Sequence, residues 1–234
     1  MSVKKLPETD EERLDILRAS IQQEEISDAW DKILSIIELQ ELSFFITAFE
    51  GDTYVLKQII IDRDKTKNKY EDLFKNAQLY ISHFIQVLLL TVIRNEIKTE
   101  NLELYGFQEN NSVLPDLSTE EAILYWGEKL IQGETERSYR GGVPLYNPAI
   151  AKVKVHYELF KELIYSLKIY DKNLLRLQNK MEDMRNKADE FILDIWTKVE
   201  ERYSKAAPDE QQFYFKAYKM QFNYRKGEQL NVFD

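Results

Sequence analysis

The strongest candidate for chemistry in the sequence is the segment 133–147, which brings arginines, tyrosines and glycines together. Its arginines could bind an anion, and its adjacent glycines give the backbone freedom to approach a ligand. The segment also precedes an expected helix start, where free amides and the helix dipole favour negative charge. The predicted ligand-binding residues are Arg137, Tyr139, Arg140, Gly141, Gly142 and Tyr146. The alternative is a plain connector, because Glu134 and Glu136 partly neutralise the two arginines.

Residue types that support other chemistry are missing or isolated. The sequence has no cysteine, which excludes disulfides, thiolate zinc sites and cysteine nucleophiles. Its two histidines, His83 and His156, lie in neither an HExxH nor an ExxH pattern, so no metal or cofactor site is predicted. The phosphate-loop, dinucleotide and nucleophile-elbow motifs are also absent. The sequence therefore predicts no catalytic residue and favours a protein that is not an enzyme.

Charge and hydropathy narrow the expected partners and location. The formal net charge is −9, from 32 basic and 41 acidic residues, whereas nucleic-acid binding needs a surplus of basic side chains. No apolar stretch of signal-peptide length opens the sequence. The most apolar run, residues 84–93, is shorter than the about 20 residues that a membrane-spanning helix needs. We therefore expect a cytoplasmic protein with no transmembrane segment and no nucleic-acid partner.

Turn residues are scarce, and this predicts long helices. Seven glycines and five prolines serve 234 residues, too few for the many connections of a β-sandwich or a doubly wound α/β fold. Capping-box patterns that begin at Thr9 and at Ser118 predict two helix starts, the second opening a short helix over 119–132. Asn147 and Pro148 predict the start of a further helix. The fold class is therefore predicted as all-α.

An internal duplication organises these helices in the sequence. A shift of 111 residues aligns 42–88 with 153–199 without a gap, with ten identities over 47 positions. Two repeat halves, 28–99 and 147–205, are each predicted to form a helical hairpin, with turns near 62–65 and 171–173. The two hairpins would pack as an up-and-down four-helix bundle. No glycine or proline lies in either turn, so two very long antiparallel helices are the alternative.

The remaining segments complete a single predicted domain over 1–234. Residues 100–146 form the connector between the halves, and residues 208–234 form an aromatic tail. The tail is predicted to dock its aromatic side chains on the end of the bundle. The alternative is a strand over 219–225 that pairs with the segment 104–117. The three tryptophans, Trp30, Trp126 and Trp196, are expected to fill the core.

Two segments carry a resemblance to a known family. Residues 140–153, RGGVPLYNPAIAKV, and residues 188–196, ADEFILDIW, resemble a family of uncharacterised bacterial all-helical proteins. The resemblance implies an all-helical fold and transfers no catalytic residue. The whole sequence predicts a non-enzymatic protein-interaction or structural module, whose partner is an unknown protein or a second copy of the chain. The alternative is a small-molecule or anion-binding protein that uses the segment 133–147.

Overall fold

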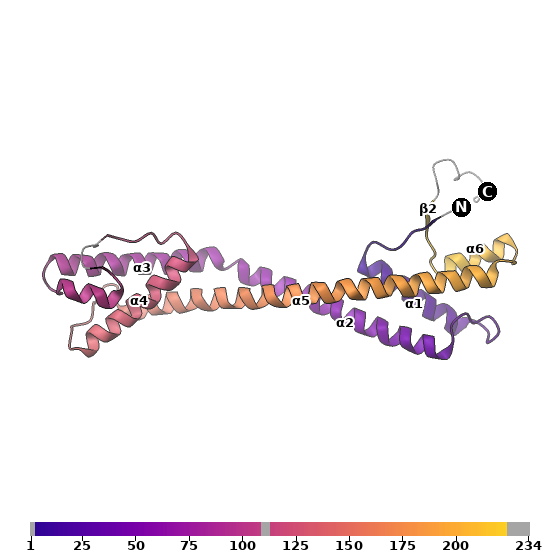
Figure 1. Ribbon diagram of the computed structural model, residues 1–234, viewed down its shortest axis with the longest axis horizontal. Helices are drawn as coiled ribbons and strands as arrows, with labels where there is room; N and C mark the ends of the chain where they lie inside the picture. Colours follow the sequence, from indigo (N-terminus) through magenta and orange to yellow (C-terminus); the bar gives the residue numbers. More distant parts are fainter. Residues whose placement is uncertain (1–2, 109–112, 224–234) are drawn as a thin grey trace. The chain divides into compact units, whose positions relative to one another are not determined.

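Helices make up most of the computed structural model, which describes residues 3–108 and 113–223 (Figure 1). The helical elements are α1 (Asp10–Ile26), α2 (Ile36–Lys67), α3 (Tyr70–Ile93), the 3₁₀ helix η1 (Thr99–Tyr105), α4 (Glu120–Tyr139), α5 (Ile150–Tyr203) and α6 (Pro208–Ala217). Two short strands, β1 (Val3–Lys4) and β2 (Phe222–Asn223), pair antiparallel. The all-α prediction is therefore confirmed.

The described chain divides into two compact units. The terminal unit comprises Met1–Ile60 and Asn173–Asp234, and the central unit comprises Ile61–Lys172. Each unit has a hydrophobic core of its own, and the cluster of buried residues in one shares no member with the cluster in the other. The sequence predicts a single bundle domain over 1–234; the described residues carry two hydrophobic clusters, one in each unit.

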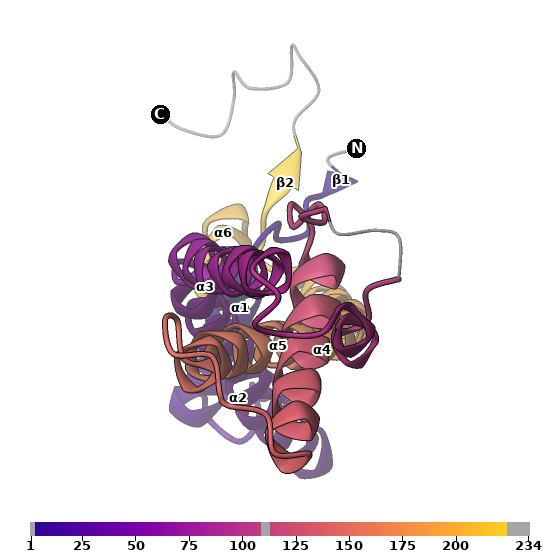
Figure 2. The ribbon, with the colours of Figure 1, turned by 90° about the vertical axis from the view of Figure 1, so that its left-hand side faces the viewer.

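In the central unit, α3 and the end of α2 lie antiparallel to the first part of α5. The ring of Tyr80 stacks on His156 with centroids 4.0 Å apart, and Arg63 Nε lies 2.6 Å from a carboxylate oxygen of Asp171. The contact nearer the start of α5 is thus made by the later residue of the α2–α3 segment, as antiparallel packing requires. Figure 2, with this unit facing the viewer, shows α4 beside the pair. The core lies between these helices and η1.

The terminal unit repeats this arrangement with the first part of α2 and the second part of α5. The rings of Phe45 and Phe191 lie 5.1 Å apart, and Lys180 Nζ lies 2.7 Å from Asp52. Two bidentate salt bridges attach helix α1 to α5. The pairs are Arg13 with Asp189 and Arg185 with Asp10, each with two hydrogen bonds of 2.7–3.0 Å.

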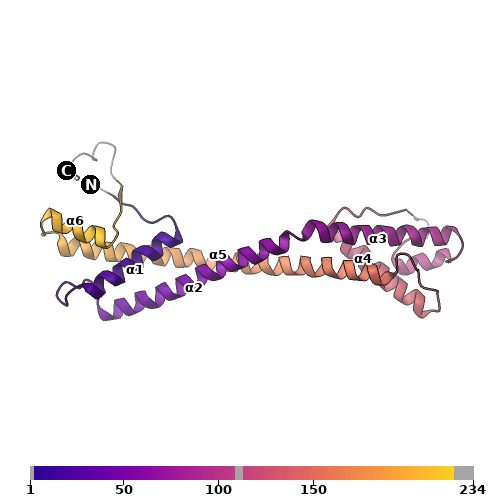
Figure 3. The same ribbon diagram turned by 180° about the vertical axis from the view of Figure 1, so that it is seen from behind.

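The predicted hairpin turns are wrong in both halves. Helix α5 runs for 54 residues without interruption, straight through 171–173 (Figure 3). The three polar residues there, Asp171, Lys172 and Asn173, are exposed on a continuous helix, so they mark a solvated face. Helix α2 likewise continues through 62–65 to Lys67, and Lys69 keeps right-handed helical angles before α3 begins. Long helices, the alternative prediction, describe both segments.

Helix starts follow the local signals of the sequence. The Thr9 capping box is complete, with hydrogen bonds in both directions between Thr9 and Glu12. Thr119 caps α4 by accepting from the amide of Ala122 at 3.2 Å. Helix α5 begins at Ile150, two residues after the predicted proline position. The Thr9 start depends on residues three apart, which is why the sequence could predict it, whereas the predicted Ser118 box is one residue early and Asn147 and Pro148 lie outside α5.

The tail combines both predicted behaviours. Residues 208–217 form α6, and Tyr218, which follows it, is fully buried in the core of the terminal unit. The strand at 222–223 pairs with Val3–Lys4 rather than with 104–117. The rest of the tail, from 224 onward, lies outside the described residues, as do the last two residues of the predicted strand.

One described stretch, Ile36–Ile93, is long and apolar enough to cross a membrane by length and composition alone. Its α3 part carries five fully buried residues of the central core: Ala77, Ile81, Phe84, Ile85 and Leu88. Three of them, Phe84, Ile85 and Leu88, belong to the apolar run 84–93, whereas Leu90 and Ile93 at the end of that run are exposed.

Lys172→Pro tests the continuity of α5. Proline removes a backbone hydrogen bond and clashes with the preceding turn, so we expect a loss of about 3 kcal/mol or more in the free energy of unfolding relative to Lys172→Ala. Urea unfolding followed by circular dichroism measures the difference. If the unfolding free energies of the proline and alanine variants differ by less than about 1 kcal/mol, the helix is interrupted at 172 and the predicted turn at 171–173 is correct.

Candidate functional site

The candidate site lies at the junction of α4 and α5 in the central unit. Helix α4 extends to Tyr139, so residues 133–139 are its last two turns, and only 140–149 form a connector. The predicted loop over 133–147 is therefore half helix. This places Glu134 and Arg137 one turn apart on the same face, where both are buried, at 1% and 5% exposure.

Glu134 is the acceptor at the centre of a closed hydrogen-bond cluster. Its Oε2 accepts from the hydroxyl of Tyr105 and, at 3.0 Å, from Arg137 Nε. Its Oε1 accepts from Arg137 Nη2 at 2.9 Å and from the amide of Leu145 at 2.7 Å. Arg137 also donates to the carbonyl of Val143 at 2.7 Å. The cluster thus joins η1, α4 and the connector, because each contributes a donor or acceptor.

Burial sets the protonation states in this cluster. Desolvation and the hydrogen bond to Glu134 raise the pKa of Tyr105 well above its ordinary value, so the phenol stays protonated and donates. Burial lowers the pKa of Arg137, but the hydrogen bonds with Glu134 and Tyr105 outweigh it, and the net shift is upward. Because both oxygens of Glu134 already accept two donors each, the carboxylate has no free position for a substrate proton. The cluster therefore suits structure better than acid–base catalysis.

A second buried carboxylate occupies the corresponding place in the terminal unit. Glu24 is fully buried near the end of α1 and accepts from the hydroxyl of Tyr218 at 2.6 Å. It also accepts from the amides of Ile33 at 3.1 Å and Leu34 at 3.2 Å, in the connector to α2. Among the described residues no cation pairs with it. The terminal unit therefore closes the same kind of cluster without an arginine.

Sequence reasoning missed both carboxylates. Glu24 and Glu134 each lie 15 residues after a helix-capping threonine, Thr9 or Thr119, and this match was the available signal. Glu24 and Glu134 are 110 residues apart rather than the 111 of the alignment, and Glu24 lies before the aligned segment 42–88. Burial of a single glutamate in an otherwise polar helix end is a tertiary property that no local pattern reveals.

A cleft of about 740 Å³ lies over the cluster, within the central unit. Of the predicted ligand-binding residues, Arg137, Arg140, Gly141, Gly142 and Tyr146 line it, and Tyr139 does not. Arg140 and Tyr146 are exposed, and Arg140 Nε pairs with Glu136 at 2.7 Å. The structure thus brings five predicted residues to one cleft, but it commits part of the Arg137 guanidinium to Glu134.

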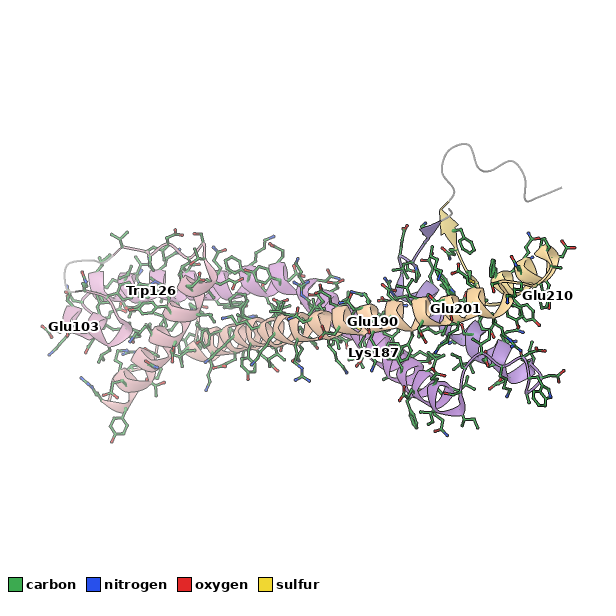
Figure 4. All side chains as sticks on the ribbon, turned by 45° about the vertical axis from the view of Figure 1, so that its right-hand side comes forward. Glu103, Trp126, Lys187, Glu190, Glu201 and Glu210 are labelled. Carbon is green, nitrogen blue, oxygen red and sulfur yellow. The ribbon has the colours of Figure 1, made fainter. Side chains whose placement is uncertain are left out.

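The remaining chemistry-bearing side chains lie elsewhere. His156 stacks on Tyr80, in line with the prediction of a boundary residue, and His83 is exposed. In the part of the chain that the structure describes, no three acidic or histidine side chains gather as a metal site. Trp196 is fully buried, and Trp126 on α4 packs on Phe107 with ring centroids 4.7 Å apart (Figure 4).

Comparisons with protein-family models, with curated proteins and with solved structures give no match to this chain.

Gly133→Ala tests whether the cluster needs close contact between α4 and η1. A Cβ at Gly133 would lie 2.6 Å from Tyr105 Cδ1 and 2.7 Å from the carbonyl oxygen of Leu104. Because one of these atoms is backbone, we expect the variant to lose about 1–3 kcal/mol of unfolding free energy despite its better helix propensity. Thermal or urea unfolding measures it.

Gly51→Ala is the matched control, because Gly51 lies in α2 with no atom within 4 Å of the added Cβ. This variant should gain up to about 1 kcal/mol from helix propensity alone. Equal stabilisation by both substitutions would contradict close packing of Tyr105 on α4.

Proposed function

We propose that this protein is a non-enzymatic interaction module that binds a partner protein through the terminal unit. The observation that carries the proposal is a set of large apolar side chains at the corner between α1 and α2, each between 69% and 89% exposed. We call these residues the apolar corner: Ile26, Trp30, Ile36, Ile37 and Phe44. Soluble proteins seldom gather such side chains at the surface unless a partner covers them.

The backbone beneath the apolar corner is held in place. The carbonyl of Trp30 accepts from Arg202 on α5 at 2.6 Å, and the amides of Ile33 and Leu34 donate to buried Glu24. The indole of Trp30 is exposed, although the sequence predicted it in the core. A large aromatic side chain on a fixed backbone loses little conformational entropy on binding, which suits an anchor residue.

Charge around the apolar corner indicates the kind of partner. Five acidic residues and one lysine lie within residues 25–44. The acids are Glu25, Asp28, Asp31, Glu38 and Glu41. A partner with an apolar surface and a basic rim would complement this segment, and added salt would slow its association.

We also propose that the chain is a tandem duplication, although its copies are not hairpins. Each copy would supply a first helix, a long helical segment and a short terminal helix: α1, α2 with α3, and η1 in the first copy, and α4, α5 and α6 in the second. Burial at aligned positions supports this proposal. Phe49 and Phe160 are fully buried, as are Ala77 and Ala188, whereas Tyr54 and Tyr165 are exposed to 65% and 67%.

The ends of the two copies support the duplication as well. Tyr105 and Tyr218 each donate to the buried glutamate on the other copy's first helix. The residue after each tyrosine is left-handed, Gly106 with φ 82° and Lys219 with φ 50°. In both places the next amide donates back to the carbonyl five residues earlier. Unrelated helix ends would share this set of features only by coincidence.

We also propose that the protein is located in the cytoplasm and that it is a member of the family of uncharacterised bacterial all-helical proteins. The absence of cysteine from the sequence supports a reducing compartment. The family resemblance rests on residues 140–153 and 188–196.

The Trp30→Ser/Phe44→Ser double variant tests the interaction. The double variant should weaken partner binding at least about 30-fold, since even one anchor of this type contributes about 2 kcal/mol or more. Immobilised wild type and variant are compared for the proteins that they retain from cell extract, with quantification by mass spectrometry. Sedimentation velocity of the purified chain separates self-association from binding to another protein.

Leu175→Ser/Phe213→Ser is the matched control, because both residues are exposed apolar side chains of the terminal unit outside the apolar corner. This control should retain the partner as the wild type does. If the corner variant and the control variant retain the same proteins in the same amounts, the apolar corner is not the binding surface.

A further inference from the structure

Comparison of the two buried clusters isolates one residue that the central unit has and the terminal unit lacks. Both clusters contain a buried glutamate, a tyrosine donor and amide donors from a connector. When Glu24 is matched to Glu134, Ser27 stands where the central unit has Arg137. The terminal unit closes its cluster with amide donors and no cation, so a buried arginine at this place is particular to the central unit.

Arg137 lies beside the cleft of about 740 Å³, and part of its guanidinium is still available there. Nε and Nη2 donate to the cluster, whereas Nη1 donates to no acceptor among the described residues. Nη1 lies against Gly142, another residue of the cleft, where an added Cβ would come within 2.7 Å of it. A residue of the cleft lining that is itself buried, at 5% exposure, therefore keeps one nitrogen without an acceptor among the described residues.

The rest of the cleft lining has two kinds of surface. Lys98 and Arg140 add two cations, against the single acid Glu96. Only Nε of Arg140 is engaged, with Glu136, so its two terminal nitrogens remain available among the described contacts. The apolar part of the lining comprises Val87, Ile97, Val143, Pro144 and Leu145. Because Glu134 and Glu136 pair with Arg137 and Arg140, the cleft offers unused donors beside an apolar wall rather than a net positive charge.

The end of α4 does not oppose an anion here. A helix C-terminus normally presents free carbonyls that repel negative charge. Three of the last four carbonyls of α4 are occupied, because Glu136, Ser138 and Arg137 accept from the amides of residues 140, 141 and 142. The carbonyl of Val143 is occupied by Arg137 Nη2. The cleft therefore presents donors rather than acceptors at this end.

We propose that the cleft binds a small organic anion, with its carboxylate or phosphate group at Arg137, Arg140 and Lys98 and its apolar body against Val87, Ile97 and Pro144. In the proposed duplication, the connector between α1 and α2 corresponds to the connector between α4 and α5, and it carries the apolar corner. The two units thus present different surfaces at matching places, one for a protein and one for a small molecule.

The test titrates the ¹⁵N-labelled full chain with hexanoate, hexyl phosphate and hexanol, which share an apolar body and differ in headgroup. We expect hexanoate or hexyl phosphate to bind at least about tenfold more tightly than hexanol, with shift changes confined to cleft residues. Comparison of the two anions distinguishes a carboxylate from a phosphate ligand.

Variants on the surface keep the test independent of folding. Lys98→Glu/Arg140→Glu should weaken anion binding at least about tenfold, since both residues are exposed and neither belongs to the buried cluster. Lys32→Glu, at an exposed lysine of the terminal connector, is the control and should change nothing. Equal binding of hexanol and hexanoate, binding of none of the three, or binding unaffected by the double charge reversal would overturn the proposal.

Discussion

The need to satisfy two buried carboxylates constrains this structure more than any other single feature. Glu24 and Glu134 lie where water does not reach, and a buried carboxylate without donors costs several kcal/mol. Each obtains donors from other elements, a tyrosine at the end of a short helix and one or two amides of a connector, and Glu134 also accepts from Arg137 of its own helix. The position of each short helix and each connector follows from that requirement. In the terminal unit the tyrosine is 194 residues away in sequence, so the hydrogen bond ties the two ends of the described chain together.

The features that the sequence could predict depend on residues close together in the chain. The Thr9 capping box and the all-α class depend on residues within a few turns of one another, and the structure confirms them, whereas the cap of α4 is Thr119, one residue after the predicted Ser118. The turns at 62–65 and 171–173 failed for a physical reason: a polar run on the solvated face of a long helix has the same composition as a turn. The lack of glycine and proline there was the better signal.

The predicted ligand-binding segment illustrates what sequence patterns leave out. Five of its six residues line the cleft, but the burial of Arg137 against Glu134 and Tyr105 depends on η1, which is about 30 residues away. No spacing rule indicates that an arginine at a helix end will divide its donors between a buried acid and a cleft. The exposure of Trp30 is of the same kind, because composition favours a buried tryptophan and only tertiary contacts decide otherwise.

A double-mutant cycle on Glu24 and Tyr218 tests most directly whether the buried carboxylate holds the terminal unit together. Glu24→Gln, Tyr218→Phe and the double variant are unfolded in urea, and the coupling free energy between the two sites is extracted. The account predicts a coupling of about 1–3 kcal/mol, as for a buried hydrogen bond to a charged group. A coupling below about 0.5 kcal/mol would mean that the two side chains act independently, and it would contradict the central role of the buried carboxylate.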